Sequence, residues 1–402
     1  MQTHSAGSKP LHILMVAPQP WFQPRGTPFS VLHRIKALSL LGHHVDLVTY
    51  PIGQDIVIDR LRIFRAARVP FIKTVKIGPS IPKIFLDITL YRKTVELLRQ
   101  NRYDYLHTHE EAAFFGIRLA QKYNLPHLYD MHSSLPQQLQ NFRFSDSKLL
   151  IRWFERMEER AVASSAAVIT ICPELQNYVE SKFPGKTCIL IENVADNSIV
   201  FPSSPGFEEE LRQKYRLDGK TVVLYYGTFE AYQGIDLLIR SAAIATAGEP
   251  RLHFLLVGGS PQQVEAYRAL AAECGVSEKI TFTGFVQPEK IPSFTAVSDI
   301  LVSPRLKGTN SPLKIYSYLR SGRPIVAVRH ITHTQILNES VAELAAPEPH
   351  AFAEAILRLA VDPKRRRQLA EAAGRMAEQH YSYEDYLQKT SWIVEQAMRA
   401  RS

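Results

Sequence analysis

The sequence predicts an α/β protein with two successive domains, each built on a parallel sheet covered by helices. Three observations lead to this fold class. Short apolar runs such as residues 11–17 (LHILMVA) indicate buried strands, and they alternate with segments whose apolar residues recur at helical spacing. Such alternation is typical of parallel sheets with helices on both faces. The pattern restarts at residues 221–226 (TVVLYY), and 402 residues suffice for two domains.

The first predicted domain covers residues 11–200. Its first strand feeds a proline-rich loop, and Gly42 follows its first helix, as is common where helices end. Along the chain we expect strands over residues 11–17, 44–50, 61–66, 105–109, 126–130 and 167–171, and helices over residues 29–41, 81–100, 112–123 and 148–164.

The second predicted domain covers residues 208–380, after a linker at residues 196–207 that is rich in proline and glycine. Two α/β halves of similar size suggest two Rossmann-like domains that face a cleft. The helical segment at residues 383–400 is a candidate to pack back on the first domain. In this half we expect strands over residues 221–226, 252–257, 280–283, 300–303 and 325–328, and helices over residues 235–247, 261–274 and 313–321.

Composition narrows the functional classes. Hydrophobic residues make up 45% and charged residues 22% of the chain, which excludes a mainly disordered protein. The 48 Lys and Arg against 39 Asp and Glu leave a charge of +9, which favours anionic partners such as phosphates, nucleotides or acidic lipid surfaces. The 3 cysteines lie far apart without a C-x-x-C pair, so neither a zinc site nor a disulfide framework is expected.

The chain shows no targeting or spanning segment in its sequence pattern. Residues 1–10 are polar and lack an apolar signal core. No apolar run reaches the roughly 18 residues that a membrane-spanning helix needs. We expect a cytoplasmic protein, either free or bound at the inner face of the membrane.

Five loops that follow strands carry candidate site residues, because ligands of parallel sheets bind beyond the carboxyl ends of the strands. In the first loop, Arg25 and Gly26 precede a helix, where glycine allows close backbone approach and free N–H groups suit an anion. A plain proline-rich connection is an equal alternative. In the second, His107 and His109 share one strand face, and Glu110 is placed to orient an imidazole. A structural histidine pair is equally consistent, and a metal site would need more ligands.

The third and fourth loops suit hydroxyl and phosphate groups. Asp130 and His132 begin a polar stretch that fits a polyhydroxylated acceptor, although Ser133 or Ser134 capping a helix would explain it equally. Gly227 and Gly234 frame a loop that permits close approach to a phosphate, with a long turn as the alternative.

The fifth loop, residues 303–314, is the one we favour most. Ser311 suits the N-cap and Pro312 the first position of the following helix. The positive end of that helix and three cations then form a cradle for a diphosphate. The cations are Arg305, Lys307 and Lys314, and solvated charges around an ordinary cap are the alternative.

Two other basic segments have simpler explanations. Residues 364–367 (KRRR) open a helix and fit a solvated face. In residues 71–93, lysines and Arg92 interleave with Phe71, Ile84 and other apolar residues, which fits contact with an anionic membrane. A substrate loop over a domain interface is the explanation we prefer for this segment. The segment's basic residues are Lys73, Lys76, Lys83, Arg92 and Lys93.

Nearly the whole chain resembles the glycosyltransferases of the GT-B fold, family 4, in the order and spacing of its motifs. PRGTPFSVLHRIKALSLLGHHVDLVTY resembles the family's glycine loop and following helix, and YDYLHTHEE its strand ending in the reactive-centre histidine. LIENVAD, LYYGTFEAYQGIDLLIRSAA, LLVGGS, ITFTGFV, SDILVSP and SPLKIYSYLRSGRPIVAV follow in family order.

The resemblance implies retaining transfer of a hexose-type sugar from a nucleotide diphosphate sugar to an acceptor hydroxyl. The acceptor would be a glycan or a lipid-linked molecule in cell-surface glycan, polysaccharide or glycolipid synthesis. The donor would lie mainly on the second domain and the acceptor on the first. Such enzymes need no metal and no cofactor, because side-chain charges and a helix start stabilise the departing diphosphate. Nucleic acid is not an expected partner.

The resemblance also assigns residues. His109 falls on the histidine near the transferred sugar, and we expect Arg305 and Lys314 to join it as catalytic groups. Arg25, Asp130 and His132 are the expected acceptor contacts. The expected donor contacts are Gly26, Gly227, Thr228, Gln233, Phe285, Val286, Gly308, Thr309, Asn310, Ser311, Leu313 and Ser317.

Four positions depart from the family pattern. The family's diphosphate-binding arginine and lysine fall on Thr228 and Gln233, and the two glutamates of its E-x7-E motif fall on Thr309 and Ser317. One account is that Arg305, Lys307 or Lys314 replaces the lost charge, and this is the account we favour. The others are a GT-B scaffold subunit without transferase activity and another GT-B enzyme such as a nucleotide-sugar epimerase.

Overall fold

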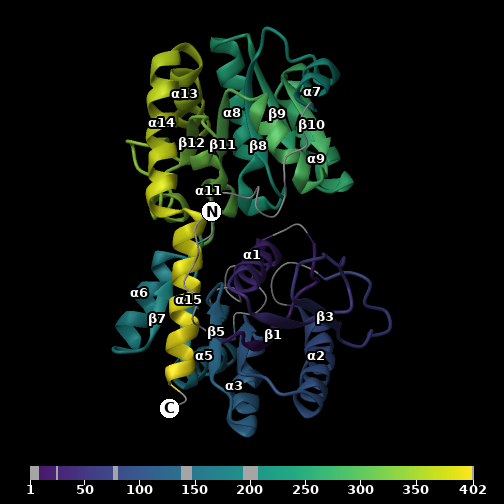
Figure 1. Ribbon diagram of the computed structural model, residues 1–402. Helices are drawn as coiled ribbons and strands as arrows, with labels where there is room; N and C mark the ends of the chain where they lie inside the picture. The colour runs from purple at the N-terminus through teal and green to yellow at the C-terminus, as the bar shows by residue number, and fades with distance from the viewer. Residues whose placement is uncertain (1–8, 24–25, 76–79, 137–146, 193–206, 401–402) are drawn as a thin grey trace. The chain divides into compact units, whose positions relative to one another are not determined.

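The computed structural model describes residues 9–23, 26–75, 80–136, 147–192 and 207–400 (Figure 1). The chain divides into two compact units, one of residues 1–192 with 384–402 and the other of residues 193–383. The linker predicted at residues 196–207 lies outside the described residues, apart from Phe207 at the start of a helix. Among the described residues, no helix combines the length and the apolar character that crossing a bilayer requires.

The first unit contains a seven-stranded sheet in the order β3-β2-β1-β4-β5-β6-β7. Every pairing in this sheet is parallel. The strands are β1 (His12–Ala17), β2 (His44–Thr49), β3 (Leu61–Arg65), β4 (Tyr105–His109), β5 (His127–Met131), β6 (Ala167–Thr170) and β7 (Cys188–Leu190).

Helices cover both faces of this sheet. The connections that contain α2, α3, α5 and α6 step across the sheet toward β7, whereas the connection that contains α1 steps from β1 toward β3. Because such connections are right-handed, α1 lies on the opposite face of the sheet from the other four helices. The C-terminal helix α15 belongs to this unit although it follows the second unit in the sequence. The helices are α1 (Gly26–Leu40), α2 (Ile81–Gln100), α3 (Ala112–Tyr123), α5 (Lys148–Ser164), α6 (Pro173–Lys182) and α15 (Tyr383–Arg399).

The second unit contains a six-stranded parallel sheet in the order β10-β9-β8-β11-β12-β13. Its strands are β8 (Thr221–Tyr226), β9 (Leu252–Val257), β10 (Ile280–Gly284), β11 (Ile300–Ser303), β12 (Ile325–Val328) and β13 (Glu343–Ala345). Its α-helices are α7 (Phe207–Tyr215), α8 (Ile235–Gly248), α9 (Pro261–Glu273), α10 (Ile291–Ala296), α11 (Leu313–Arg320), α12 (Ile331–Thr334), α13 (Pro349–Val361) and α14 (Pro363–His380).

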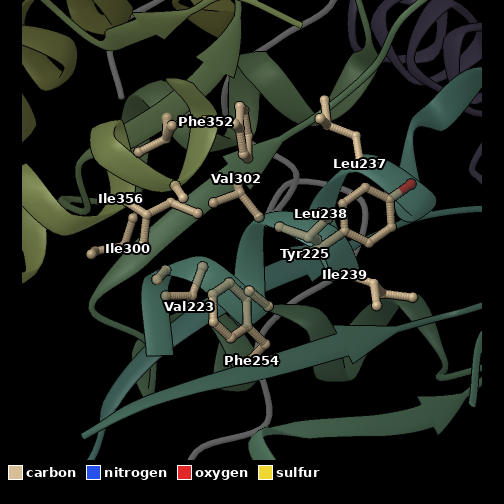
Figure 2. Close-up of a cluster of buried hydrophobic side chains, with 14 of the residues drawn as sticks. Val223, Tyr225, Leu237, Leu238, Ile239, Phe254, Ile300, Val302, Phe352 and Ile356 are labelled. Carbon is tan, nitrogen blue, oxygen red and sulfur yellow. The ribbon is translucent and has the colours of Figure 1, made fainter. Parts of the chain in front are cut away.

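Alternate residues of each strand in the second unit enter two separate cores, because successive side chains of a strand point to opposite faces. Val223 and Tyr225 of β8 pack with helices α8 and α13 on one face (Figure 2). Val222 and Leu224 of the same strand pack with α10 and α11 on the other face. A strand buried on both faces is expected to be mainly apolar, as the predicted run TVVLYY is.

The predicted α/β fold class, with two parallel sheets, is confirmed. Helices α2, α3 and α5 and strands β4, β8, β9, β11 and β12 have the predicted bounds. The sequence analysis missed α6, β7, α7, α10, α12, β13 and α13. β7 and β13 are 3-residue strands, and such short runs carry little periodicity.

Gly258 offers a test of how tightly the strand ends of the second sheet pack. It has φ +126°, and a Cβ atom there would lie 1.9 Å from the backbone oxygen of Gly227. We expect Gly258→Ala to lower the free energy of unfolding of the second unit by about 3 kcal/mol, since strain and a backbone clash combine. Gly275→Ala is the matched control, because Gly275 has φ +70° but open space around it, and about 1 kcal/mol is expected there. Urea unfolding of both variants measures the difference, and equal losses would contradict the packing argument.

Candidate functional site

Strand alternation gathers polar side chains on the α1 face of the first sheet. Leu106 of β4 packs toward α2 and α3, and Tyr129 and Met131 of β5 pack toward α3, α5 and α6. The alternate positions of the same two strands therefore point to the opposite face of the sheet. These positions carry His107 and His109 of β4 and Asp130 of β5, and all three side chains are fully buried.

Asp130 is the centre of this cluster. Its Oδ2 atom accepts a hydrogen bond from Nε of Arg34 at 2.9 Å and lies 3.4 Å from Nε2 of His107. Its Oδ1 atom lies 3.4 Å from Nε2 of His132. Nδ1 of His109 lies 3.7 Å from Oδ2 and forms a 2.8 Å hydrogen bond with Nε2 of His132. One buried carboxylate thus contacts one guanidinium and three imidazoles.

The electrostatics keep the imidazoles neutral and the carboxylate charged. Burial lowers the pKa of His107, lowers that of His132 to about 4, and lowers that of His109 well below its usual value. Burial alone would raise the pKa of Asp130, but the charge of the Arg34 guanidinium opposes it and holds that pKa well below the usual range. Neutral imidazoles can donate or accept hydrogen bonds, as recognition of a sugar hydroxyl requires.

Arg34 is held in place by the C-terminal helix. Its Nη1 atom donates a hydrogen bond to Oγ1 of Thr390 at 3.2 Å, and its guanidinium lies 5.0 Å from the ring centre of Tyr386. The sequence analysis missed this residue. A signal was present, because Arg34 shares the buried stripe of α1 with Val31 and Leu38 at helical spacing, and a charge there needs a buried partner.

Glu110 does not orient an imidazole as predicted. Its Oε1 atom accepts a hydrogen bond from Oγ1 of Thr27 at 3.4 Å, and its Oε2 atom accepts one from Oγ of Ser133 at 2.8 Å. Glu110 has φ +49°, so the chain turns sharply after His109 and directs the carboxylate away from the histidines. Glu110 thus links the first turn of α1 to the loop that follows β5. Burial and the nearby Glu111 raise the pKa of Glu110 to about 7.

Of the predicted acceptor contacts, Asp130 and His132 lie together, with 3.4 Å between Oδ1 and Nε2. Asp130 is fully buried and paired with Arg34, so its carboxylate is not exposed to an acceptor. Arg25 lies outside the described residues. Gly26 begins α1, next to the Thr27 contact with the end of β4, and a Cβ atom there would meet nothing within 4 Å. Nε2 of His109 is buried and has no hydrogen-bond partner among the described residues, as is also true of Nδ1 of His107, so it is one of the imidazole atoms available to a ligand.

His107, His109 and Asp130 also offer metal-ligand atoms that lie within 4.8 Å of one another. The guanidinium of Arg34 already occupies the side of Asp130 Oδ2 and supplies the positive charge that a metal ion would bring. A second cation beside it would be repelled at short range in a buried setting. The cluster therefore fits an arginine-centred network better than a metal site.

In the second unit, Lys314 lies at the start of α11 as a buried cation without an anionic partner. Its Nζ atom has no hydrogen-bond partner among the described residues and lies 3.8 Å from the ring centre of Tyr225. A Cβ atom on Gly227, whose φ is +144°, would be 3.1 Å from that Nζ atom. Burial and the nearby Arg305 lower the pKa of Lys314 well below its usual value. The end of β8 and the start of α11 thus meet around an ammonium group.

The predicted cap of this helix is wrong. The helix begins at Leu313, Pro312 occupies the capping position, and no side chain makes a capping hydrogen bond. Ser311 lies one residue earlier, and its buried Oγ atom has no hydrogen-bond partner among the described residues. Ser311 is a buried polar group next to Lys314, and it is not exposed to open solvent as a simple surface cap would be.

Arg305 and Gly308 shape the loop between β11 and α11. The guanidinium of Arg305 lies 5.3 Å from the ring centre of Tyr232, and its Nε atom donates to the backbone oxygen of Lys307 at 2.9 Å. Gly308 has φ +108°, and a Cβ atom there would lie 2.4 Å from Nη2 of Arg305. Lys307 itself is exposed. Of the three predicted cations, Lys314 is buried, Arg305 is partly buried and near enough to lower the pKa of Lys314, and Lys307 faces solvent.

The neutral positions of the predicted donor site are also placed around these loops. The backbone oxygen of Thr228 accepts a hydrogen bond from the hydroxyl of Tyr225 at 2.7 Å, and Oε1 of the buried Gln233 has no hydrogen-bond partner among the described residues. The backbone oxygen of Thr309 accepts from Gln335 at 2.6 Å. Ser317 hydrogen-bonds Tyr226. Of the remaining predicted contacts, Asn310, Leu313 and Val286 are partly buried and Phe285 is exposed.

Comparison with known proteins identifies the class. Residues 24–198 match the family model described as Glycosyltransferase Family 4, and residues 207–376 match the one described as Glycosyl transferases group 1. Together the two matches span most of the chain. The chain therefore belongs to the group 1 glycosyltransferases of family 4 and has their GT-B fold.

Individual relatives are distant. The chain is 25% identical to the alpha-D-kanosaminyltransferase of Streptomyces kanamyceticus over 277 residues, which are 67% of this chain and 70% of that one. Among solved structures, sucrose-phosphate synthase from Thermosynechococcus elongatus superposes with a TM-score of 0.77 at 21% identity over 97% and 100% of the two chains. Anabaena HepE, solved in complex with UDP-glucose, has a TM-score of 0.71 at 17% identity over 96% and 99%. At these identities the two structures bear on the fold alone.

The pairing of Asp130 with Arg34 predicts a large stability effect. Asp130→Asn leaves a buried guanidinium without its carboxylate, so we expect a loss of about 3–5 kcal/mol in the free energy of unfolding of the first unit. Arg34→Met with Asp130→Asn should lose less than the sum of the single variants, because neither charge then remains unpaired. Urea unfolding of the unchanged protein, the two single variants and the double variant measures the coupling free energy between Arg34 and Asp130. Additive losses would show that the two groups do not interact in the folded protein.

Proposed function

We propose that this chain transfers a hexose-type sugar from a nucleotide diphosphate sugar to an acceptor hydroxyl, with retention of configuration and without a metal ion. The second unit binds the nucleoside diphosphate part of the donor, and the first unit binds the acceptor. The acceptor is a glycan or lipid-linked molecule of a surface polysaccharide or glycolipid, and the enzyme works in the cytoplasm or at the inner face of the membrane. Family membership and the fold shared with a UDP-glucose-binding protein support the donor class.

The buried ammonium of Lys314 is the observation that carries the proposal. A buried cation costs free energy unless an anion pairs with it. Lys314 has no such partner among the described residues, and Arg305 beside it increases the cost. A bound diphosphate would supply the missing negative charge. The two cations then take the role of the family's arginine and lysine, whose positions here are Thr228 and Gln233.

The proposed reaction breaks the bond between the anomeric carbon and the phosphate oxygen and forms a bond from that carbon to the acceptor oxygen. The acceptor attacks from the face that the nucleotide leaves, and its proton passes to the departing phosphate oxygen. Lys314 and Arg305 stabilise the negative charge that develops on this oxygen. His109 hydrogen-bonds the transferred sugar through Nε2, and the Asp130 cluster fixes the orientation of its ring.

A non-catalytic scaffold subunit is the second candidate, and the four neutral positions favour it. Thr309 and Ser317 stand where the family has glutamates, and a serine or threonine hydroxyl holds a ribose or sugar hydroxyl less strongly than a carboxylate does. Such a subunit would bind nucleotide weakly or not at all and would depend on a partner chain.

Lys314 gives the first test of donor binding. Because its ammonium would face the diphosphate, we expect Lys314→Ala to weaken nucleoside diphosphate binding about tenfold or more, measured by isothermal titration. The matched control is Lys364→Ala, an exposed cation in the KRRR segment, which should change the affinity less than about twofold. Equal effects of the two substitutions would remove Lys314 from the site.

The pH dependence of the same binding gives an independent readout. The pKa of Lys314 is lowered in the free protein, and a bound diphosphate should raise it. Binding then takes up a proton. The affinity should therefore fall as the pH rises from the pKa of Lys314 in the free protein to its pKa in the complex. The titrations belong above about pH 7, where the terminal phosphate, with a pKa of about 6, is already ionised. Lys314→Ala should abolish the proton uptake, which titrations in buffers of different ionisation enthalpy detect.

His109 gives the test of the chemical step. We expect His109→Ala to lower turnover about 100-fold while donor affinity changes about twofold or less, because its contact matters most as the sugar transfers. His44→Ala, an exposed histidine of β2 in the same unit, should leave both unchanged. The reverse pattern at His109 would make it a donor-binding residue.

Incubation with donor alone distinguishes the candidate functions. A transferase should hydrolyse its own donor slowly when no acceptor is present, whereas an epimerase would return an isomerised donor. A panel of common nucleotide sugars, followed by product analysis, measures both. A scaffold would show no turnover with any donor at high protein concentration.

A further inference from the structure

The first three turns of α2 expose apolar side chains that its position in the fold does not require. The buried side of α2 carries Leu86, Leu90 and Leu97, which pack into the core of the first unit. With 3.6 residues per turn, Ile84 and Ile88 lie on the opposite side of the helix. That side would normally carry polar residues. It exposes Ile81, Ile84, Phe85, Ile88 and Tyr91 instead.

The exposed apolar surface continues across α3 to α5. The ring of Tyr91 on α2 packs edge-on against Phe115 of α3 at 5.5 Å between centroids. The neighbouring Phe114 contacts Trp153 of α5 at 6.4 Å. Figure 1 shows α2, α3 and α5 in the same unit, and α3 packs against both of the others. We call this surface the apolar band, and it comprises Ile81, Ile84, Phe85, Ile88, Tyr91, Phe114, Phe115, Leu149 and Trp153.

The band lies at the N-terminal turns of its three helices and does not extend along their whole length. After Tyr91, α2 exposes Arg92, Glu96 and Arg99. An apolar surface confined to one end of three neighbouring helices has a common orientation, and such a surface can meet one flat partner at the same time. Helices α2, α3 and α5 all begin after strands, so this end lies at the carboxyl edge of the first sheet, where His109 also lies.

Basic residues border the band. Arg152 and Arg156 of α5 follow Leu149 by three and seven positions and so lie on the same side of the helix as Trp153, and both are exposed. Arg92 and Lys148 are exposed at the α2 and α5 borders. The arrangement of aromatic and aliphatic side chains with arginines and lysines beside them is that of a surface that binds anionic lipid.

The acids near the band are largely compensated. Asp87 of α2 accepts a hydrogen bond from the hydroxyl of Tyr50 at 2.6 Å, and burial together with Glu111 raises its pKa to about 8, so it is mostly uncharged at neutral pH. Glu111 lies 3.7 Å from Nζ of Lys83. Glu155 of α5 is exposed. The border of the band therefore carries more positive than negative charge.

We infer that the apolar band docks the first unit on an anionic lipid bilayer, with its aliphatic and aromatic side chains in the interfacial region and Arg92, Lys148, Arg152 and Arg156 on lipid phosphates. The bilayer is the occupant because the band is bordered by cations and crosses three helices at one end. The inference goes beyond the proposed sugar transfer, since docking needs no donor and can be measured without one. It develops the membrane explanation of this segment in place of the substrate-loop explanation, and it rests on Ile81, Ile84 and Phe85, which lie on the predicted helix α2.

Sedimentation with vesicles tests the docking. Full-length protein without donor should bind vesicles of phosphatidylcholine with about 30% phosphatidylglycerol at least tenfold more tightly than vesicles of phosphatidylcholine alone, and added salt should weaken this binding. The double variant Ile84→Ser with Phe85→Ser should lose tenfold or more of the affinity. Val361→Ser is the matched control, because Val361 is an isolated apolar residue that is 67% exposed in the second unit, and it should bind as the unchanged protein does.

Tryptophan fluorescence locates the contact. The chain has 3 tryptophans, of which Trp21 is fully buried, Trp153 is 51% exposed in the band and Trp392 is 44% exposed on α15. Anionic vesicles should shift the emission to the blue in Trp392→Phe, which keeps Trp153, and should leave it unshifted in Trp153→Phe.

Three results would overturn the inference. They are equal binding to neutral and anionic vesicles, a blue shift that depends on Trp392, and a concentration-dependent mass in analytical ultracentrifugation that the Ile84→Ser and Phe85→Ser variant abolishes. The last result would make the band a contact between copies of this chain. Circular dichroism and unfolding of each variant establish that it is folded. If the full-length protein binds anionic vesicles but turns over no donor, that result would count against the proposed transferase and would still support the docking surface.

Discussion

Parallel pairing of every strand in both sheets is the constraint on which the candidate sites depend. Parallel strands bring their carboxyl ends to one edge, so the loops after β1, β4 and β5 meet there in the first unit and the loops after β8 and β11 meet in the second. Most of the crossovers run through a helix, and each such helix begins near that same edge. Side chains far apart in the sequence, such as His109 and His132, which are 23 positions apart, therefore become neighbours without any local sequence signal.

The two units each bury a cation, but they treat it differently. Arg34 has a carboxylate, a hydroxyl and an aromatic ring around its guanidinium, so its charge is satisfied within the fold. Lys314 has an aromatic ring on one side and no anionic partner among the described residues. A satisfied charge contributes structure, whereas an unsatisfied one in a folded protein marks a candidate binding site. This difference separates a residue that positions others from one that we propose to bind substrate.

Sequence patterns predicted most of the fold because buried parallel strands are continuous apolar runs and amphipathic helices have a clear period. They also placed His107 and His109 on one face of a strand, which the 4.7 Å stacking of the two rings bears out. They did not identify Thr390 and Tyr386 as the partners of Arg34, because those contacts join segments separated by more than 350 positions and no local pattern reports such a contact. The cap at Ser311 failed for a different reason. Cap preferences are statistical, and here Pro312 turns the chain one residue later.

The C-terminal helix α15 gives the first unit an unusual order of assembly. During synthesis the strands of the first sheet emerge early, but Thr390 and Tyr386 leave the ribosome only after the whole second unit has been made. Until then Arg34 lacks its contacts with Thr390 and Tyr386. Domains usually fold in the order of synthesis. Here the surroundings of Arg34 and the histidine cluster are completed last, so a nascent or truncated chain would carry a nearly finished sheet with an incomplete cluster.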